Sequence, residues 1–204
     1  MLRVTEIFRS LQGEGRRAGE PSVFVRFSGC SAKHACASSG VVCDTEFESG
    51  TAFETEELLE VVERVARGIK WVVWTGGEPI DQLTEAIVRE FKRAGYHQQI
   101  ETSGIGRVPA GLDWVTVSPK VAEHILVRHF PERQDGLHVD ELKYVRHVGQ
   151  AIPEPALKAA VYCLSPHSDG DLLNRANLEH CIQLCYDHPA WRLSVQQHKL
   201  WRVR

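Results

Sequence analysis

Short apolar runs alternate with helical segments along this chain, and this order restricts its fold more than any other feature. Residues typical of buried strands lie at 22–27, 71–75, 98–103, 114–119, 141–145, 159–166 and 191–196. Helices are predicted at 54–68 and 81–95, because apolar residues recur there at helical spacing between an acidic start and a glycine. A later helix is predicted at 170–188, and 121–140 is predicted to be an irregular connecting excursion. The order predicts an α/β fold with a mostly parallel sheet and right-handed crossovers.

The length and composition predict a single domain that spans residues 1–204. With 204 residues, 43% hydrophobic and 25% charged, the chain can bury a core without disulfides. Its net charge of −3 gives no general attraction to nucleic acid, although Arg16 and Arg17 could hold a small anion. No stretch reaches the roughly 18 apolar residues of a membrane span, and the N-terminus lacks a signal core. We therefore expect a cytoplasmic protein, not bound to a membrane, that acts on a small molecule.

Polar motifs follow four of the predicted strands at or near the point where each strand ends. They read TGGEP at 75–79, ETSG at 101–104, SPK at 118–120 and QQHK at 196–199. The carboxyl ends of parallel strands meet at one edge of the sheet, so these motifs are expected to converge on one mouth. A loop rich in cysteine follows the strand at 22–27 and is expected to open into the same mouth.

The cysteine loop carries Cys30, His34, Cys36 and Cys43, and these side chains leave two hypotheses open. In a reducing compartment such a group favours metal or cluster ligation over a disulfide framework. All four side chains match a closed zinc site of three cysteines and one histidine, which the thiols alone favour. The three cysteines without the histidine would instead hold an iron–sulfur cluster with one iron open to a ligand. The remaining cysteines, at 163, 181 and 185, are predicted to be small buried hydrophobes.

The TGGEP motif is a feature that a structural zinc site leaves unexplained. Two adjacent glycines, Gly76 and Gly77, let the backbone approach a ligand, and Glu78 with Pro79 fixes a turn that carries a carboxylate. A tight turn without a ligand is the alternative. A cysteine loop after one strand and a glycine-glycine-glutamate-proline turn after the next resemble the radical S-adenosylmethionine (SAM) enzymes, in which an open iron binds SAM.

Over nearly its whole length the chain resembles one family of these enzymes, the 7-carboxy-7-deazaguanine synthases. The stretches that carry the resemblance are EIFRSLQGEG (6–15), GEPSVFVRFSGC (19–30), CDTEF (43–47), TGGEP (75–79), IETSG (100–104), VSPK (117–120), ELKYV (141–145) and RLSVQQHK (192–199). The resemblance implies an incomplete (β/α) barrel of the radical SAM type. It also implies a carbon–nitrogen lyase that converts 6-carboxy-5,6,7,8-tetrahydropterin into 7-carboxy-7-deazaguanine with loss of ammonia, on the route to queuosine. In that reaction a [4Fe–4S] cluster and SAM generate a 5′-deoxyadenosyl radical, while the protein positions the cofactors and the pterin.

The resemblance also implies a role for individual residues. The cluster ligands would be Cys30, Cys36 and Cys43, and Thr45 would contribute to a Mg²⁺ ion, which prefers oxygen ligands. Positions that would face SAM are Gly76, Gly77, Glu78, Ser103, Ser118 and Lys120. Positions that would face the pterin are Gln12, Glu14, Gly15, Arg26, Thr75 and His198. The family further implies a homodimer and an electron donor such as flavodoxin or ferredoxin.

Two stretches depart from the family pattern. The cysteines are spaced C-x5-C-x6-C instead of C-x3-C-x2-C, so Gly40 stands where the second ligand is usual, and Cys36 is expected to replace it. His34 is expected to be exposed or to donate a hydrogen bond near the cluster. The strand end at 161–168 lacks the expected glutamine, so the adenosine contact is assigned to Ser165 or His167.

Two other functions remain open from the sequence. A glycyl radical enzyme activase would share the short length and the cysteine loop, but QGEG and QQHK are not expected in it. A non-catalytic binding domain with a structural zinc site is favoured only by the irregular cysteine spacing.

Overall fold

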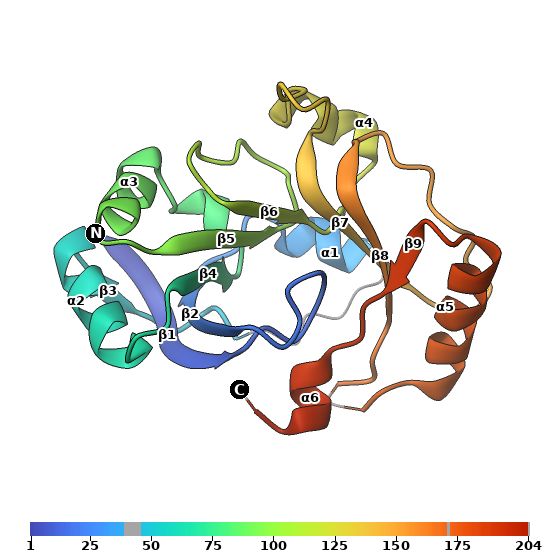
Figure 1. Cartoon of the computed structure of the whole chain (residues 1–204), viewed down its shortest axis with the longest axis horizontal. Helices are drawn as coiled ribbons and strands as arrows, with labels where there is room; N and C mark the ends of the chain where they lie inside the picture. The colour runs from blue at the N-terminus through green and yellow to red at the C-terminus, as the bar shows by residue number, and fades with distance from the viewer. Residues whose placement is uncertain (39–45, 171, 204) are drawn as a thin grey trace.

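The computed structural model describes residues 1–38, 46–170 and 172–203, and one nine-stranded sheet organises this part of the chain (Figure 1). The strands are β1 (Leu2–Leu11), β2 (Pro21–Phe27), β3 (Thr51–Phe53), β4 (Trp71–Gly76), β5 (His97–Thr102), β6 (Trp114–Val117), β7 (Val139–Arg146), β8 (Ala159–Pro166) and β9 (Trp191–Leu193). Their order in the sheet is β3-β1-β2-β4-β5-β6-β7-β8-β9. In the described residues no pairing joins the edge strands β3 and β9, so the sheet is an open, incomplete barrel.

The sheet is parallel from β2 to β9, and only the N-terminal strands break this rule. β1 pairs antiparallel with both β2 and β3, whereas each of the six pairs from β2–β4 to β8–β9 is parallel. The carboxyl ends of seven strands therefore meet at one edge, as the α/β prediction requires. The turn between β1 and β2 projects into the concave side of the arched sheet (Figure 1).

Helices lie between the strands along the chain and after the last one. They are α1 (Lys33–Ser38), α2 (Thr55–Ala66), α3 (Glu85–Arg93), α4 (Glu123–Leu126), α5 (Arg175–Asp187) and α6 (Gln197–Trp201), with 3-10 turns η1 (Pro79–Asp81) and η2 (Val127–His129). α2 begins at a capping box, in which Glu54 and Glu57 satisfy each other's backbone amides. α3 begins at Thr84, whose hydroxyl accepts from the amide of Ile87. None of the helices in the described ranges has the length and apolar character that crossing a membrane requires.

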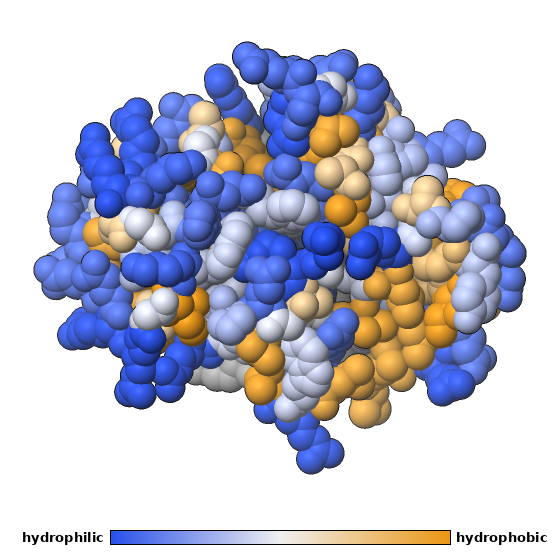
Figure 2. All heavy atoms as spheres, viewed as in Figure 1, coloured by the Kyte–Doolittle hydropathy of each residue, from blue (hydrophilic) through white to orange (hydrophobic). Residues whose placement is uncertain are grey.

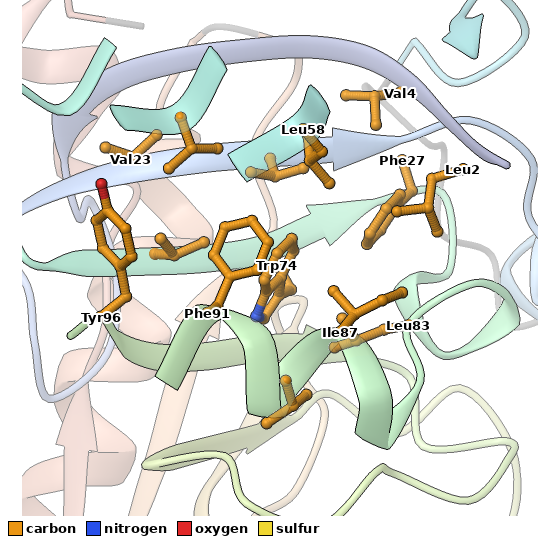
Figure 3. Packing of buried hydrophobic residues seen from close by; sticks show 14 of the residues in the cluster. Leu2, Val4, Val23, Phe27, Leu58, Trp74, Leu83, Ile87, Phe91 and Tyr96 are labelled. Atoms are coloured by element: carbon orange, nitrogen blue, oxygen red, sulfur yellow. The ribbon is translucent and has the colours of Figure 1, made fainter. Parts of the chain in front are cut away.

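Two buried clusters hold the helices against the sheet. In the first, the Trp74 ring stacks on Phe27 at 5.7 Å between centroids and meets the edge of Phe91 at 4.7 Å (Figure 3). The second lies beneath α5 and includes Leu142, Leu164 and Cys181. Cys163 and Cys181 are at most 1% exposed and Cys185 packs partly buried against the second cluster, which confirms that these three cysteines are hydrophobes.

Three differences from the sequence-based prediction concern short or half-buried elements. β1 is not predicted, because its central residues are half-buried on both faces and lack the alternation of a typical strand. The last strand ends at Leu193 instead of 196, and α6 begins at Gln197. The excursion at 121–140 contains the short elements α4 and η2.

Candidate active site

The cysteine loop and the glycine turn are joined backbone to backbone at the carboxyl ends of β2 and β4. The amide of Gly77 donates to the Phe27 carbonyl over 3.1 Å, and the amide of Glu78 donates to the Gly29 carbonyl over 3.1 Å. A Cβ atom at position 77 would lie 1.7 Å from that Gly29 oxygen and 2.9 Å from the Cβ of Cys30. Glycine is required here because no side chain fits beside Cys30.

Replacing Gly77 by alanine is expected to lower the free energy of unfolding by about 1–3 kcal/mol, because the added methyl group overlaps the Gly29 carbonyl. Urea denaturation at constant pH measures the change. Gly106→Ala is the matched control, since its Cβ would approach only the flexible end of Ile80, at 2.7 Å. An equal loss in both variants would contradict the packing argument.

Glu78 braces the ends of two neighbouring strands. Its side chain is 1% exposed and accepts from the Thr102 hydroxyl over 2.5 Å, from the Ser103 amide over 2.9 Å and from the Ser103 hydroxyl. Burial raises the pKa of Glu78, and the bonds from Ser103 and Thr102 oppose that shift. Two residues expected to face SAM, Glu78 and Ser103, are therefore bonded to each other at the mouth.

The described thiols lie on either side of a short turn beneath the same edge. Cys30 follows β2 and Cys36 lies in α1, while the third expected ligand, Cys43, and the expected Mg²⁺ ligand, Thr45, lie outside the described residues. Among the residues that the structure describes, no three His, Cys, Asp or Glu side chains are grouped to hold a metal ion. The side chain of Asp81 accepts from the amide and hydroxyl of Ser31, at 2.9 and 2.7 Å, which ties the start of the loop to η1.

The chemistry of these donors fits an iron–sulfur cluster. Thiolates are its usual ligands, and a set of three leaves one iron position open for another molecule. The absence of a side chain at Gly77 lets the glycine turn pack directly against Gly29 and the first thiol, Cys30. The residues present therefore suit a cluster with SAM next to it.

A cavity of about 940 Å³ lies on the concave side of the sheet. Its lining includes five of the six residues expected to face the pterin, which come from distant parts of the chain: Gln12, Glu14, Arg26, Thr75 and His198. Glu6, Glu46, Glu101 and Lys143 also line it. The cavity is therefore rich in charge, and charged and polar side chains fill the middle of this face of the molecule (Figure 2).

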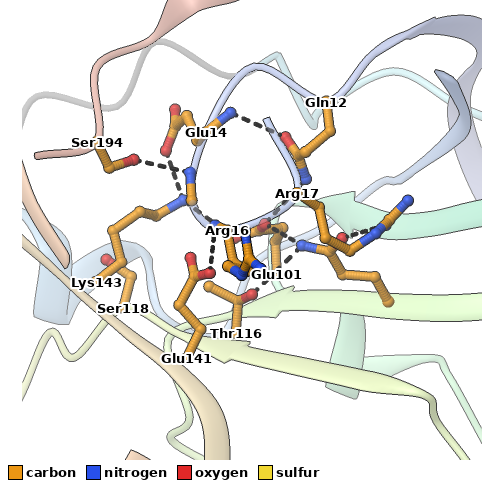
Figure 4. Close-up of polar contacts among 12 residues, drawn as sticks. Gln12, Glu14, Arg16, Arg17, Glu101, Thr116, Ser118, Glu141, Lys143 and Ser194 are labelled. Atoms are coloured by element: carbon orange, nitrogen blue, oxygen red, sulfur yellow. Dashed lines mark hydrogen bonds and ion pairs between the residues drawn. The ribbon is translucent and has the colours of Figure 1, made fainter. Parts of the chain in front are cut away.

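A buried ammonium group bridges two carboxylates in this cavity. Lys143, 8% exposed, lies 2.5 Å from a Glu14 oxygen and 3.1 Å from a Glu101 oxygen (Figure 4). Gln12 donates to the other Glu101 oxygen over 3.2 Å. The three side chains and Gln12 form one hydrogen-bonded network across the turn after β1, β5 and β7.

The two carboxylates of this network differ in pKa. Burial alone would raise the pKa of Glu14, but the charge and hydrogen bond of Lys143 lower it to about 2. Burial raises the pKa of Glu101 to about 7, with repulsion from Glu141 and Glu14 adding to the rise and Lys143 opposing it. The pKa of Glu14 therefore lies far below neutral pH, whereas that of Glu101 is raised toward neutral pH.

Arg26 and Thr75 stand side by side on one wall of the cavity. They are register partners on the parallel strands β2 and β4. The Nε of Arg26 donates to a Glu6 carboxylate oxygen over 2.7 Å. The guanidinium group is thus held in place within the cavity, with a carboxylate already on one of its edges.

The C-terminal helix brings His198 against the N-terminal turn. A Cβ atom on Gly13 would lie 2.1 Å from the Nδ1 of His198, so a glycine is needed for the imidazole to approach. Gly15, also expected to face the pterin, is not among the described lining residues. It supports the turn instead, because its amide donates to the Ser194 hydroxyl over 2.8 Å.

The remaining residues expected to face SAM lie at the ends of β6 and β8. Lys120 donates to the Ser118 hydroxyl over 3.1 Å and lines a second hollow of about 720 Å³, together with Ala35 of α1. His167, one of two candidates for the adenosine contact, stacks on His147 at 4.3 Å between ring centroids. Ser165, the other candidate, is 5% exposed.

Sequence reasoning missed Glu101 and Lys143 as site residues and misjudged one arginine. Both missed residues lie within strands that the sequence predicts as buried, and an ionisable residue in such a strand is itself a signal. Of the pair expected to hold an anion, Arg16 is exposed but Arg17 is 4% exposed and faces inward. Arg17 is therefore not available to hold an anion from solution together with Arg16.

Comparison with known proteins extends these observations. No family model matches the chain. It is 38% identical to a 7-carboxy-7-deazaguanine synthase of Caulobacter vibrioides, with 96% of each chain covered, and 37% identical to one of Bacteroides thetaiotaomicron over 100% of both. The chain belongs to the 7-carboxy-7-deazaguanine synthase family. A crystal structure of QueE from Escherichia coli is similar to this synthase fold with a TM-score of 0.69, at 27% identity over 97% of this chain and 94% of that one.

Membership in the 7-carboxy-7-deazaguanine synthase family decides between the hypotheses that the sequence left open. The chain is an enzyme with the radical SAM fold of this family, which confirms the mostly parallel α/β prediction. The non-catalytic zinc domain is wrong, and the glycyl radical activase is not supported by any of these relatives.

Proposed function

We propose that the cavity of about 940 Å³ binds 6-carboxy-5,6,7,8-tetrahydropterin and that the chain contracts its ring to 7-carboxy-7-deazaguanine, with loss of ammonia. The observation that carries this proposal is the meeting of Gln12, Glu14, Arg26, Thr75 and His198 in one cavity. The product would enter the biosynthesis of queuosine or a related deazapurine. Residues 1–204 would act as one radical SAM domain.

The proposed cofactor ligands follow from the donor set and the family. Cys30, Cys36 and Cys43 would hold the [4Fe–4S] cluster, and Thr45 would hold Mg²⁺. SAM would lie against Gly76, Gly77, Glu78, Ser103, Ser118 and Lys120, with its adenosine near Ser165 or His167. The cluster and SAM together would provide the radical chemistry that removes a hydrogen atom from the bound pterin.

The side chains of the cavity would bind and orient the substrate. Arg26, held by Glu6, would offer its remaining edge to the substrate carboxylate. Glu14, kept anionic by Lys143, would accept from paired N–H donors of the pterin.

The proposed cluster and the rim of the cavity indicate two partners, an electron donor and a second copy of the chain. The cluster would need an external one-electron donor, such as flavodoxin or ferredoxin, and the need for reduced thiolates supports a location in the cytoplasm. Exposed Leu172, Leu200 and Val203 line one side of the cavity, where apolar residues gather around α6 (Figure 2). An exposed apolar rim of this kind supports a homodimer.

The proposal is tested with protein purified without oxygen and reconstituted with iron and sulfide. Incubation with SAM, Mg²⁺, a reductant and the carboxytetrahydropterin should yield 7-carboxy-7-deazaguanine and one ammonia per product. Chromatography with mass detection measures the product, and an enzymatic assay measures the ammonia. Cluster-loaded protein that cleaves SAM but leaves the pterin unchanged would contradict the proposal.

Replacing Glu101 by glutamine is expected to lower kcat/KM about ten- to a hundred-fold, because a charged acceptor of the cavity is lost.

The same substitution should change how stability depends on pH. The folded-state pKa of Glu101, about 7, lies above its ordinary value of 4.5. The wild-type carboxylate therefore costs stability as pH rises from its ordinary pKa through about 7. The variant should lose less stability than the wild type between pH 5 and 8 in urea denaturation. Parallel stability curves for the two proteins would contradict this pKa.

A further inference from the structure

Arg17 is a buried cation that supports the turn between β1 and β2 without lining the cavity. Its guanidinium carbon lies 3.4 Å from the centroid of the Trp71 ring. Its Nε pairs with Glu20 over 2.9 Å, and its Nη1 donates to the Oε1 of Gln99 over 2.5 Å. The side chain is 5% exposed, so these partners take the place of water.

The contact with Gln99 has a direction, because a guanidinium can only donate. Gln99 must present its carbonyl oxygen to Arg17, which turns its NH₂ group the other way. That group donates to Glu101 Oε1 over 2.7 Å and lies 3.3 Å from the Thr116 hydroxyl. A flipped amide would place an oxygen against the Glu101 carboxylate and leave Arg17 facing an NH₂ group.

The series of hydrogen bonds from Arg17 through Gln99 ends at Glu101, whose carboxylate lines the cavity. One oxygen of Glu101 accepts hydrogen bonds from the side-chain amides of Gln12 and Gln99, and the other accepts one from Lys143. Its charged neighbours come from two elements: Lys143 and Glu141 on β7, and Glu14 and Arg17 on the turn after β1. Arg17 and Lys143 favour the carboxylate form, whereas Glu14 and Glu141 oppose it.

We propose that Arg17 is a positioning residue, which acts through Gln99 to hold Glu101 as an oriented hydrogen-bond acceptor in the cavity. Arg17 is not among the described residues that line the cavity. Its removal would free the Gln99 amide to rotate and would withdraw one of two cations that stabilise the Glu101 anion. The use of that acceptor for the pterin rests on the proposed function, whereas the state of the carboxylate does not.

The direct test is the titration of Glu101 by ¹³C NMR in protein labelled at glutamate carboxyl carbons, with Glu101→Gln to assign the signal. The wild-type midpoint should lie near the pKa of about 7. In Arg17→Met it should rise by about one pH unit, since a nearby cation lowers a carboxyl pKa by roughly that much. Arg16→Met is the matched control: Arg16 is exposed, and its bond to Glu141 uses only the backbone amide.

Gln99→Leu separates the action through the amide from simple support of the turn. It leaves the bonds of Arg17 to Glu20 and Ser22 in place but removes the donor to Glu101. Its midpoint should rise as in Arg17→Met, and the double variant should show less than the sum of the two shifts. Unchanged midpoints in both single variants, or fully additive shifts, would overturn the proposal.

Steady-state kinetics of the reconstituted enzyme link this effect to the substrate. At pH 7 the KM of Arg17→Met should rise about five-fold with kcat unchanged, because a one-unit shift leaves about a fifth as much carboxylate. The difference should vanish near pH 9. Shifted NMR midpoints in a protein that does not convert the pterin would uphold the role of Arg17 and refute the proposed function. Equal KM values at pH 7 in a working enzyme would refute the link to the substrate.

Discussion

Replacing Lys143 by methionine is expected to lower the free energy of unfolding by about 3 kcal/mol at pH 8 and to abolish pterin binding. The ammonium group lies between Glu14 and Glu101, at 2.5 and 3.1 Å. Methionine fills a similar volume but leaves two carboxylates in a buried site without a cation. Urea denaturation measures the loss of stability, and calorimetry measures pterin binding.

The loss in Lys143→Met should depend on pH. Without the cation the pKa values of Glu14 and Glu101 both rise, so the folded variant takes up protons as the pH falls and relieves the repulsion. The destabilisation should therefore be smaller at pH 5 than at pH 8. Lys158→Met is the matched control, because Lys158 pairs with Glu132 at the surface, where both side chains are more than half exposed. A loss independent of pH, or an equal loss in Lys158→Met, would contradict a buried bridging role.

Replacing Cys36 by alanine is expected to reduce the iron content of reconstituted protein from about four atoms per chain to near zero, because a cubane held by two thiolates is not retained. Broad absorbance near 400 nm and the cleavage of SAM should disappear with the iron. The variant is informative because Cys36 lies in α1, at a spacing from Cys30 that differs from the usual family pattern.

Cys185→Ala provides the matched control for this measurement. Cys185 lies in α5 and packs against the second buried cluster, so its loss should leave the iron content unchanged. A full complement of iron in Cys36→Ala would show that another residue holds the cluster. One tightly held zinc ion and no iron in the wild type would refute the proposed cluster.

The order of elements and five of the residues that line the cavity could be predicted from the sequence. Apolar runs and helical periods are local signals, so α2, α3 and the core of each parallel strand lie close to their predicted positions. β1 escaped prediction because its pairing with β2 and β3 leaves its middle half-buried on both faces. α6 escaped because QQHK follows directly on an apolar strand and has no cap signal of its own.

The site residues also divide into those that local sequence signals indicate and those that depend on tertiary contacts. The sequence by itself determined the residue types, their motifs and their spacing. These local features indicated the thiols, the glycine turn and five side chains of the cavity, because each of them lies within a short stretch of the chain. Only the tertiary structure decided that Lys143 bridges Glu14 and Glu101 across separations of 129 and 42 residues, and that Arg17 is buried while Arg16 is exposed. Those outcomes depend on strand register and on burial, which set the partner and the pKa of each charge, and no local pattern carries that information.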